Sequence, residues 1–437
     1  MSRKPAKARN APKPEGAGGL VPRLRFPEFR EAGEWEERQL QDLCDVTRGG
    51  SPRPIVDYIS ESDGALPWLR IGDIDPAGKY VTATNEKIKP EGLNKTTLIK
   101  PGEFILSNSM SFGRPYIAKI HVCIHDGWLA LRNLREGLCR EFLYYGISGD
   151  QIQKSFEQAA AGTGVRNLKS ESVKLIPVLI PALPEQQKIA DCLSSLDDRI
   201  RLEAERLNAL KDYKKGLMQQ MLPAEGETVP RLRFEEFRGA GEWEAKHLEE
   251  VATFFKGKGL PKSAITPNGK YPCIHYGELF TEYPEVIRSA RSRTDLNGNT
   301  FLSRSNDVLM PTSDVTPSGL AKACCIKLNR VVLGGDILVI RASKDAVEGG
   351  FLARYIRHLE PKVLQLVSGS TVFHLYATSI GKLTLRFPRK PEQEKIADCL
   401  SSLDDRIRLE AERLDALKDH KKGLMQQIFP ALHDIAK

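Results

Sequence analysis

The chain has 437 residues, with 41% hydrophobic residues, 28% charged residues and a net charge of +8. This composition is typical of a globular protein and excludes a wholly disordered chain. No apolar run approaches the roughly 20 residues that cross a bilayer, and the length predicts two or three domains.

The first twenty residues are basic and rich in Pro, Ala and Gly, without the apolar stretch of a signal peptide. We expect residues 1–20 to form a disordered tail; contact with nucleic acid is an open alternative. The eight cysteines form no CxxC pair. Without an export signal they predict reduced thiols in a cytoplasmic protein.

Two segments of the chain occur twice. "PRLRFPEFREAGEWE" begins at Pro22, and "PRLRFEEFRGAGEWE" begins at Pro230. Residues 184–224 align with residues 391–431 without a gap, and only five of these 41 positions differ. The chain is therefore two half-chains in tandem, and each copy has the size of a domain rather than of a short stacking repeat.

The longer repeated segment predicts a long helix in each half, over 184–224 and 391–431. Apolar residues follow alternating steps of four and three, which is the a/d pattern of a coiled coil. Pro184 and Pro391 suit a first helical turn, and Pro223 and Pro430 end the helices. The apolar seam comprises Ile189, Leu193, Leu196, Ile200, Leu207, Leu210 and Leu217 in the first copy and Ile396, Leu400, Leu403, Ile407, Leu414, Leu417 and Leu424 in the second.

Each helix needs a partner for its seam, and the other copy is available. An antiparallel pair, with an internal pseudo-twofold, would place the two domains at opposite ends of a rod roughly 57 Å long. Polar residues interrupt the seam, and Glu203 could face Lys421 while Lys214 faces Glu410 to fix the register. The alternative is that these residues lie at the edge of the seam in contact with water.

The remaining stretches, 21–183 and 225–390, contain short alternating apolar runs broken by Gly, Pro and Asn, together with a few short helices. They predict two unlike α+β domains, and 432–437 is expected to be a tail. The excess of basic residues lies in these unlike stretches and the N-terminal tail, which suits a polyanionic partner.

Catalytic motifs are missing from the sequence. It has no [DN]PP[YFW] or FxGxG adenine methyltransferase motif, no P-loop and no nuclease-like Pro-Asp followed by Glu-x-Lys. His121, Cys123 and His125 would share one strand face, but without a second ligand cluster ordinary core residues are the stronger interpretation than a metal site. Two unlike domains without a catalytic set look like binding modules.

Loops of both domains carry side chains that can bind DNA, since Arg reads guanine, Asn reads adenine and Lys holds phosphate. For each residue the alternative is a solvated surface group. The candidates of the first domain are Arg48, Ser51, Arg53, Arg70, Asp73, Asn108, Ser109, Arg114, Arg166, Asn167 and Lys169. Those of the second are Lys256, Lys258, Lys262, His275, Tyr276, Glu278, Ser313, Asp314, Lys344, Ser370 and His374.

The order of these features resembles the specificity subunit of type I restriction–modification systems. The resemblance rests on a variable domain, a helix entered through "ALPEQQKIADCLSSLDDRI", a second variable domain and a second helix entered through "RKPEQEKIADCLSSLDDRI". "PWLRIGDI" and "CIHYGELF" are also similar to that family. The resemblance implies two target recognition domains, 21–183 and 225–390, each reading one half of a bipartite, asymmetric DNA site.

The resemblance also implies that the helix pair sets the spacer between the half-sites and docks two modification subunits. Those partners would carry S-adenosylmethionine and flip the adenine that they methylate. Two restriction subunits would add ATP- and Mg-dependent translocation and cleavage, so this chain would hold no cofactor or metal and perform no catalysis. One rival hypothesis is a stand-alone enzyme, and another is a coiled-coil adaptor whose two domains bind ligands other than DNA.

Overall fold

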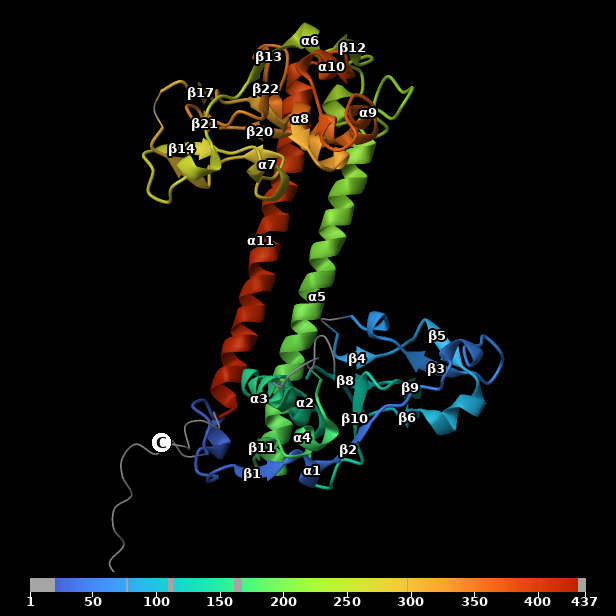
Figure 1. The fold of residues 1–437 in the computed structure, drawn as a ribbon. Helices are drawn as coiled ribbons and strands as arrows, with labels where there is room; N and C mark the ends of the chain where they lie inside the picture. Colours follow the sequence, from blue (N-terminus) through green and yellow to red (C-terminus); the bar gives the residue numbers. More distant parts are fainter. Residues whose placement is uncertain (1–19, 76–77, 109–112, 161–166, 297, 431–437) are drawn as a thin grey trace, which may run out of the picture. The chain divides into compact units, whose positions relative to one another are not determined.

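The computed structural model describes residues 20–75, 78–108, 113–160, 167–296 and 298–430. It divides into two compact units (Figure 1). Unit 1 comprises Met1–Glu203 and Arg413–Lys437, and unit 2 comprises Ala204–Glu412. The division falls inside the two long helices, so each unit holds one globular domain, the start of one helix and the end of the other.

The globular part of unit 1 is built on a five-stranded sheet of order β2-β10-β7-β8-β4 and a four-stranded sheet of order β5-β3-β9-β6. The first sheet contains β2 (Asp45–Arg48), β4 (Tyr80–Val81), β7 (Phe104–Ser107), β8 (Pro115–Ala118) and β10 (Trp128–Arg132). The second contains β3 (Leu66–Leu69), β5 (Glu86–Ile88), β6 (Thr97–Ile99) and β9 (Val122–Ile124). A separate pair joins β1 (Glu36–Gln39) to β11 (Pro177–Ile180).

The helices of unit 1 cover one face of the five-stranded sheet. They are α1 (Leu40–Leu43), α2 (Arg140–Ser148), α3 (Asp150–Ala160) and α4 (Ser170–Lys174), with 3₁₀ turns η1 (Pro27–Phe29), η2 (Ile55–Asp57), η3 (Ile71–Asp73) and η4 (Pro90–Lys95). Along β7, Phe104 and Leu106 join the core formed with α2, whereas Ile105 joins the core on the other face. Because successive strand residues point to opposite faces, a strand buried on both faces reads as a continuous apolar run.

Unit 2 repeats this topology with sheets of order β13-β22-β18-β20-β15 and β16-β14-β21-β17, plus the pairs β12-β24 and β19-β23. The first sheet contains β13 (Ala252–Lys256), β15 (Val286–Ile287), β18 (Asp307–Pro311), β20 (Cys324–Ile326) and β22 (Ile337–Ala342), and the second β14 (Tyr271–Ile274), β16 (Ser292–Thr294), β17 (Phe301–Leu302) and β21 (Val332–Leu333). The pairs are formed by β12 (Glu244–His247), β24 (Thr384–Phe387), β19 (Ser313–Asp314) and β23 (Phe373–His374).

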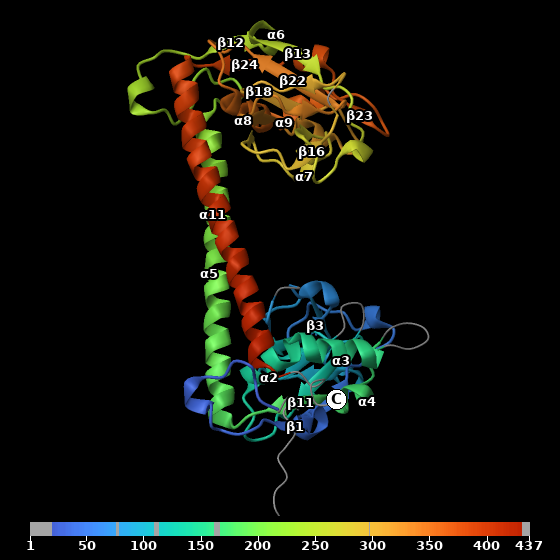
Figure 2. The ribbon, with the colours of Figure 1, turned by 90° about the vertical axis from the view of Figure 1, so that its left-hand side faces the viewer.

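Helix α8 packs on β18 and β20 in unit 2 (Figure 2). The helices of this unit are α6 (Leu248–Val251), α7 (Glu278–Thr281), α8 (Gly349–His358), α9 (Glu360–Gln365) and α10 (Ala377–Ile380), with 3₁₀ turns η5 (Glu235–Phe237), η6 (Lys262–Ala264) and η7 (Pro317–Ala321). The α+β class predicted for both domains is confirmed.

A close backbone approach recurs at one place in both domains. A Cβ atom on Gly49 would lie 2.1 Å from the carbonyl oxygen of His125, and one on Gly257 would lie 1.9 Å from that of Gly334. No side chain fits at such distances, so glycine is required after β2 and after β13. The two domains thus share a backbone design beneath different side chains.

The long helices are α5 (Leu183–Met221) and α11 (Lys390–Ile428). In unit 1 the start of α5 packs on the end of α11, where Ile189 and Leu193 meet Leu424 and Ile428. In unit 2 the start of α11 packs on the end of α5 through Ile396, Leu400 and Leu217. Both units therefore pair the helices antiparallel, as predicted, and all fourteen seam residues are buried or half-buried.

The repeated "PRLRF…GEWE" segment joins each domain to its helices. Arg25 forms a two-pronged ion pair with Glu185 at the start of α5, with N–O distances of 2.7 and 2.6 Å. The side chain of Glu185 is 1% exposed. Arg233 repeats this contact with Glu392 at 2.7 Å for both oxygens. In each unit the repeated entry segment contacts the start of the repeated helix. This contact is a physical reason for both segments to occur twice.

The glutamine of each "PEQ" entry ties the helix start to the domain. Gln186 accepts a hydrogen bond from the backbone N–H of Cys139 and donates to the carbonyl of Pro181, each at 2.8 Å. Gln393 makes the equivalent bonds to Glu348 and Pro388 in unit 2.

The polar seam residues have other partners than the predicted ones. Glu203 forms an ion pair with Arg413 at 3.3 Å, and Glu410 forms one with Arg206 at 3.0 Å. Lys421 forms an ion pair with Asp197, and Lys214 forms one with Asp404. These two pairs join corresponding residues of the repeat. The predicted pairing of Glu203 with Lys421 and of Lys214 with Glu410 is therefore wrong, because the register of the antiparallel helices brings other charges of the opposite helix closer.

In the part of the chain that the model describes, no helix is both long and apolar enough to cross a membrane.

Candidate nucleic-acid interface

Four of the candidate side chains of the first domain converge on the turn between β9 and β10. The carbonyl oxygen of Asp126 accepts hydrogen bonds from Arg48 Nε and Asn108 Nδ2, both at 2.9 Å. Its carboxylate accepts from Ser51 Oγ at 2.8 Å and contacts Arg53 at 3.4 Å. These residues meet because β2 and β7 end where the antiparallel strand β10 begins.

The Asp126 carboxylate is held in its charged form. The hydrogen bond from Ser51 lowers its pKa, and the nearby Arg48 acts in the same direction against the cost of partial burial. A fixed anion at this turn orients the guanidinium group of Arg53 while leaving most of it exposed, at 81%.

The Arg70 and Asp73 candidates occupy the neighbouring corner, where β3 runs into η3. Asp73 Oδ2 accepts the backbone N–H of Arg70 at 2.8 Å, and Arg70 forms an ion pair with Glu86 at 2.7 Å. The ring of His125, next to Asp126, packs 6.0 Å from that of Trp68 on β3. The corner and the Asp126 turn therefore form one continuous edge of unit 1.

The same edge exists in unit 2. Lys256 at the end of β13 forms an ion pair with Asp336 at 3.5 Å, and the carbonyl of Asp336 accepts the N–H of Thr312 after β18. Lys258 donates its backbone N–H to Leu333. Lys256 pairs with Leu338 on β22, and Arg48 pairs with Leu129 on β10, the equivalent strand. Lys256 therefore occupies the position in unit 2 that Arg48 occupies in unit 1.

The corner of unit 2 is formed by His275, Tyr276 and Glu278. Glu278 accepts the backbone N–H of His275 at 2.6 Å, as Asp73 accepts that of Arg70. The rings of His275 and Tyr276 lie 4.6 Å apart. Parallel pairing of β14 with β21 and of β3 with β9 gives the two corners the same register.

The loop before the next helix completes the edge in both domains. Leu168 donates its N–H to the carbonyl of Asn108, and Leu375 donates to that of Thr312. Asn167 and His374 therefore occupy equivalent positions beside the edge. Ser313 and Asp314 form β19 against β23, which places them next to His374.

The other candidates are less central. Lys169 lies just before α4 and Arg114 just before β8, while Lys262 begins η6 and Ser370 lies in the loop before β23. Lys344 follows the opposite end of β22, where Ser343 donates its N–H to Val251, so it lies away from this edge and its contact with DNA stays a prediction. Ser109 and Arg166 lie outside the described residues.

Two candidates are occupied by structural contacts. Asn108 is only 1% exposed and directs its amide at Asp126. Asp314 accepts the N–H of Val315 at 2.7 Å and the hydroxyl of Thr316 at 2.9 Å. Both residues shape loops rather than present a free polar group.

Sequence reasoning missed Asp126, on which these candidate side chains converge. Asp126 precedes Gly127, and an Asp-Gly step between apolar runs is a turn signal that could have marked it.

The "HVCIH" segment shows no ligand cluster. Cys123 is buried in β9, and the ring of His125 lies 5.9 Å from that of Trp128. Among the described residues, no group of three or more His, Cys, Asp or Glu side chains is placed to hold a metal ion.

A second surface recurs at the junction of each domain with its helices. A groove of about 780 Å³ in unit 1 is lined by Lys418, Lys421 and Lys422 of α11, together with α2 and α3 residues. A groove of about 710 Å³ in unit 2 is lined by Lys211, Lys214 and Lys215 of α5. The three lysines of each groove are the same residues of the repeat, so the two halves present matching grooves.

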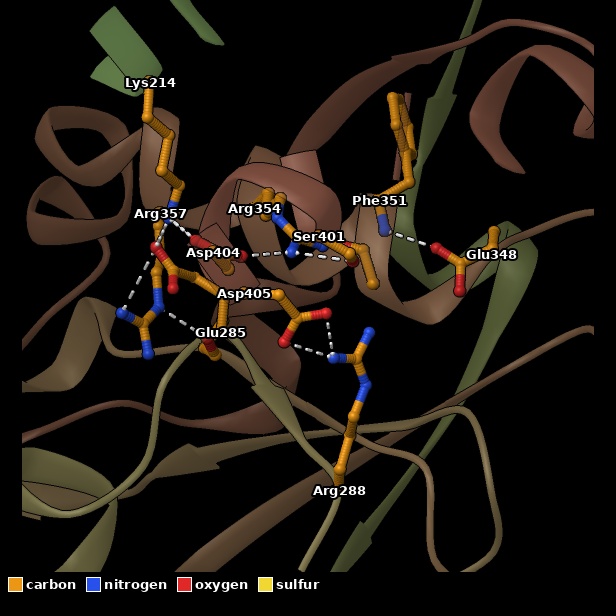
Figure 3. Close-up of polar contacts among 12 residues, drawn as sticks. Lys214, Glu285, Arg288, Glu348, Phe351, Arg354, Arg357, Ser401, Asp404 and Asp405 are labelled. Atoms are coloured by element: carbon orange, nitrogen blue, oxygen red, sulfur yellow. Dashed lines mark hydrogen bonds and ion pairs between the residues drawn. The ribbon is translucent and has the colours of Figure 1, made fainter. Parts of the chain in front are cut away.

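The charges in the two grooves are balanced differently. In unit 2, Lys214 contacts Glu285 at 2.9 Å as well as Asp404, and Arg354 donates to Asp404 at 2.6 Å (Figure 3). Burial alone would raise the pKa of Glu285, but Lys214 and Arg357 outweigh it and hold the pKa at about 2. In unit 1, Tyr145 takes the position of Arg354 and donates to Asp197 at 2.7 Å.

Comparison with known proteins gives the same repeated organisation. Residues 32–212 and 240–419 match the family model described as the type I restriction modification DNA specificity domain. The chain is 22% identical over 437 residues to the type I restriction enzyme MjaVIII specificity subunit of Methanocaldococcus jannaschii, covering 93% of both chains. It is 23% identical over 416 residues to the putative MjaX specificity subunit of the same organism, covering 91% of this chain and 93% of that one.

Solved structures share the fold. The S subunit of a type I restriction–modification system from M. genitalium has a TM-score of 0.59 at 15% identity, with 94% of this chain and 99% of that chain covered. A chain from a study of complex assembly and conformational transition in the type I R-M system has a TM-score of 0.56 at 19% identity, with 90% and 97% covered. Because the family model matches most of its length, the chain belongs to the family of type I restriction–modification DNA specificity domains.

Proposed function

We propose that this chain reads a bipartite, asymmetric DNA site, one half through each target recognition domain. One observation supports this most directly. The same backbone edge carries different side chains in the two domains: Arg48 against Lys256, Arg70 against His275, and Asn167 against His374. A shared scaffold with different hydrogen-bonding groups is what reading two different half-sites requires.

The helix pair, in this proposal, sets the spacer between the half-sites. Each helix has 39 residues and is therefore about 58 Å long. The buried seam fixes the register of one helix against the other. The length of the helix pair is therefore set by the fold.

Two modification subunits are proposed to dock on the repeated helices. The two matching grooves support this, since equal surfaces suit equal partners. Leu202 and Leu409, which correspond in the repeat, are 55% and 56% exposed and lie outside the seam. An exposed leucine at the same place in both copies supports a repeated apolar contact with a partner.

The chemistry of the complex is assigned to its partners. In this proposal S-adenosylmethionine binds the modification subunits, and ATP and Mg bind the restriction subunits. This chain supplies sequence recognition and performs no catalysis. The alternative, an adaptor whose domains bind ligands other than DNA, predicts no salt-dependent affinity for DNA.

The test is a methylation map. The chain is expressed with its cognate modification subunit in a methylation-free host, and N6-methyladenine is located by long-read sequencing. The expected result is one split, asymmetric motif with a fixed gap. An assembled complex that leaves no methylation and binds DNA without salt dependence would overturn the proposal in favour of the adaptor.

A deletion tests the spacer role separately. Removing one heptad from both helices, residues 204–210 and 411–417, keeps the seam in phase and shortens the pair by about 10 Å. At 3.4 Å per base pair, the gap should change by about three base pairs while both half-sites stay the same. A changed half-site with an unchanged gap would contradict the spacer role.

A further inference from the structure

The β19–β23 pair of unit 2 is a small antiparallel ribbon with an exposed apolar tip. Its register pairs Ser313 with His374 and Asp314 with Phe373. Val315 follows β19 and Val372 precedes β23, and these side chains are 71% and 42% exposed. The end of the ribbon therefore carries two aliphatic side chains that the domain core does not cover.

The ribbon is held in a defined shape. Ser368 and His374 exchange two backbone hydrogen bonds of 3.0 and 2.7 Å, which close a hairpin over β23. Gly369 has φ of +120°, and a Cβ atom there would lie 2.1 Å from the carbonyl oxygen of Val372, so only glycine fits. The bonds from Asp314 to Val315 and Thr316 fix the other side of the tip. The tip is thus built before any partner binds.

The position of the ribbon points to its partner. Its base continues the candidate DNA edge, because Leu375 donates to Thr312 and Thr312 donates to Asp336, the partner of Lys256. Lys256 is 65% exposed and available to a phosphate. A two-stranded ribbon fits the DNA major groove, where the only apolar group on a base edge is the thymine 5-methyl.

We propose that the ribbon enters the major groove of the second half-site and that Val315 contacts a thymine 5-methyl group there. The inference rests on the proposed function and assigns one of its specificity-determining residues. Val315 supplies the apolar contact, and Asp314 positions the loop without touching a base. His374 lies on the same ribbon, and its ring is 6.0 Å from that of Tyr376, which precedes α10.

The experiment removes one partner of the proposed contact at a time, either the thymine 5-methyl group or the apolar side chain of Val315. Duplexes of the mapped site are made with deoxyuridine in place of thymidine at one position at a time, and affinity is measured for the full chain assembled with its modification subunit. Wild type should lose about fourfold affinity at one position of the second half-site, the effect of one buried methyl group. Val315→Ser should lose a similar amount on ordinary DNA and show no further loss at that position.

The matched control is Val56→Ser, which changes a valine 73% exposed in unit 1. It should keep the wild-type response to deoxyuridine. The inference is overturned if no position of the second half-site responds, or if Val315→Ser responds as wild type does. A wild-type complex without sequence-specific binding would overturn the proposed function itself, which is a separate result.

Discussion

Lys214 of α5 forms an ion pair with Glu285 at 2.9 Å, and in unit 1 the corresponding two positions hold Lys421 and Lys79. The repeated helix thus meets a carboxylate in one domain and an ammonium group in the other. Burial lowers the pKa of Lys79, and Lys421 lowers it further, although Asp197 opposes this. The Lys79 ammonium lies 4.6 Å from the centre of the Tyr145 ring, which partly replaces the missing anion.

Glu285→Gln should destabilise unit 2 by about 3 kcal/mol at pH 7, because the folded pKa of about 2 lies well below the ordinary 4.5. A lowered carboxylate pKa contributes stability above pH 4.5 and loses it as the pH falls toward 2. The difference in unfolding free energy between wild type and variant should therefore shrink across that window in urea titrations. The control is Glu282→Gln, at a carboxylate 42% exposed in the same loop, and its cost in unfolding free energy at pH 7 should stay below about 1 kcal/mol.

Arg25→Met should cost about 3–5 kcal/mol of unfolding free energy, because it leaves the buried Glu185 carboxylate without its cation. Arg233→Met should do the same in unit 2. The control is Arg38→Met, whose partner Glu36 is exposed, and its cost should stay below about 1 kcal/mol. Equal losses for Arg25→Met and Arg38→Met in denaturant titration would contradict the role given to the buried pair.

If each domain reads one half-site as proposed, Asp126→Ala should relax the half-site of the first domain and leave the other half-site unchanged. The variant releases Ser51 and Arg53 from their carboxylate, and a lost base contact costs about 1–3 kcal/mol of discrimination. The methylation map measures both halves at once. Asp45→Ala is the control, because Asp45 faces Arg132 at the opposite end of the β2–β10 pair and should leave the motif unchanged.

If modification subunits dock at the grooves as proposed, Lys418→Glu with Lys422→Glu should weaken docking on unit 1, and Lys211→Glu with Lys215→Glu should weaken docking on unit 2. These exposed lysines line the matching grooves, which carry more cationic than anionic side chains. Native mass spectrometry gives the stoichiometry. Lys188→Glu changes an exposed lysine at the start of α5 and should keep both copies. Retention of two copies by both groove variants would locate docking elsewhere on the helices.

Local patterns were enough to predict part of this protein. The a/d spacing of Ile189, Leu193 and their repeats predicts two long helices that pair, because the helical period is short and an apolar seam needs a partner. The antiparallel direction followed from the tandem order, in which each helix follows its own domain. The alternating apolar runs predict the α+β class. The duplicated entry segments predict two half-chains in tandem, each with one domain.

Contacts between distant segments were decided by the tertiary structure. Arg25 and Glu185 are separated by 160 residues, and Ser51 and Asp126 by 75, so no local pattern pairs them. Lys214 and Lys421 pair with the corresponding aspartates Asp404 and Asp197, but the folded domains add Glu285 at one place and Lys79 at the equivalent place, which the repeated helices alone do not predict. The sequence by itself determined the repeated frame, because helical periodicity is local; only the fold decided which side chains meet on the edge, because strand order and register are set by packing across the whole domain.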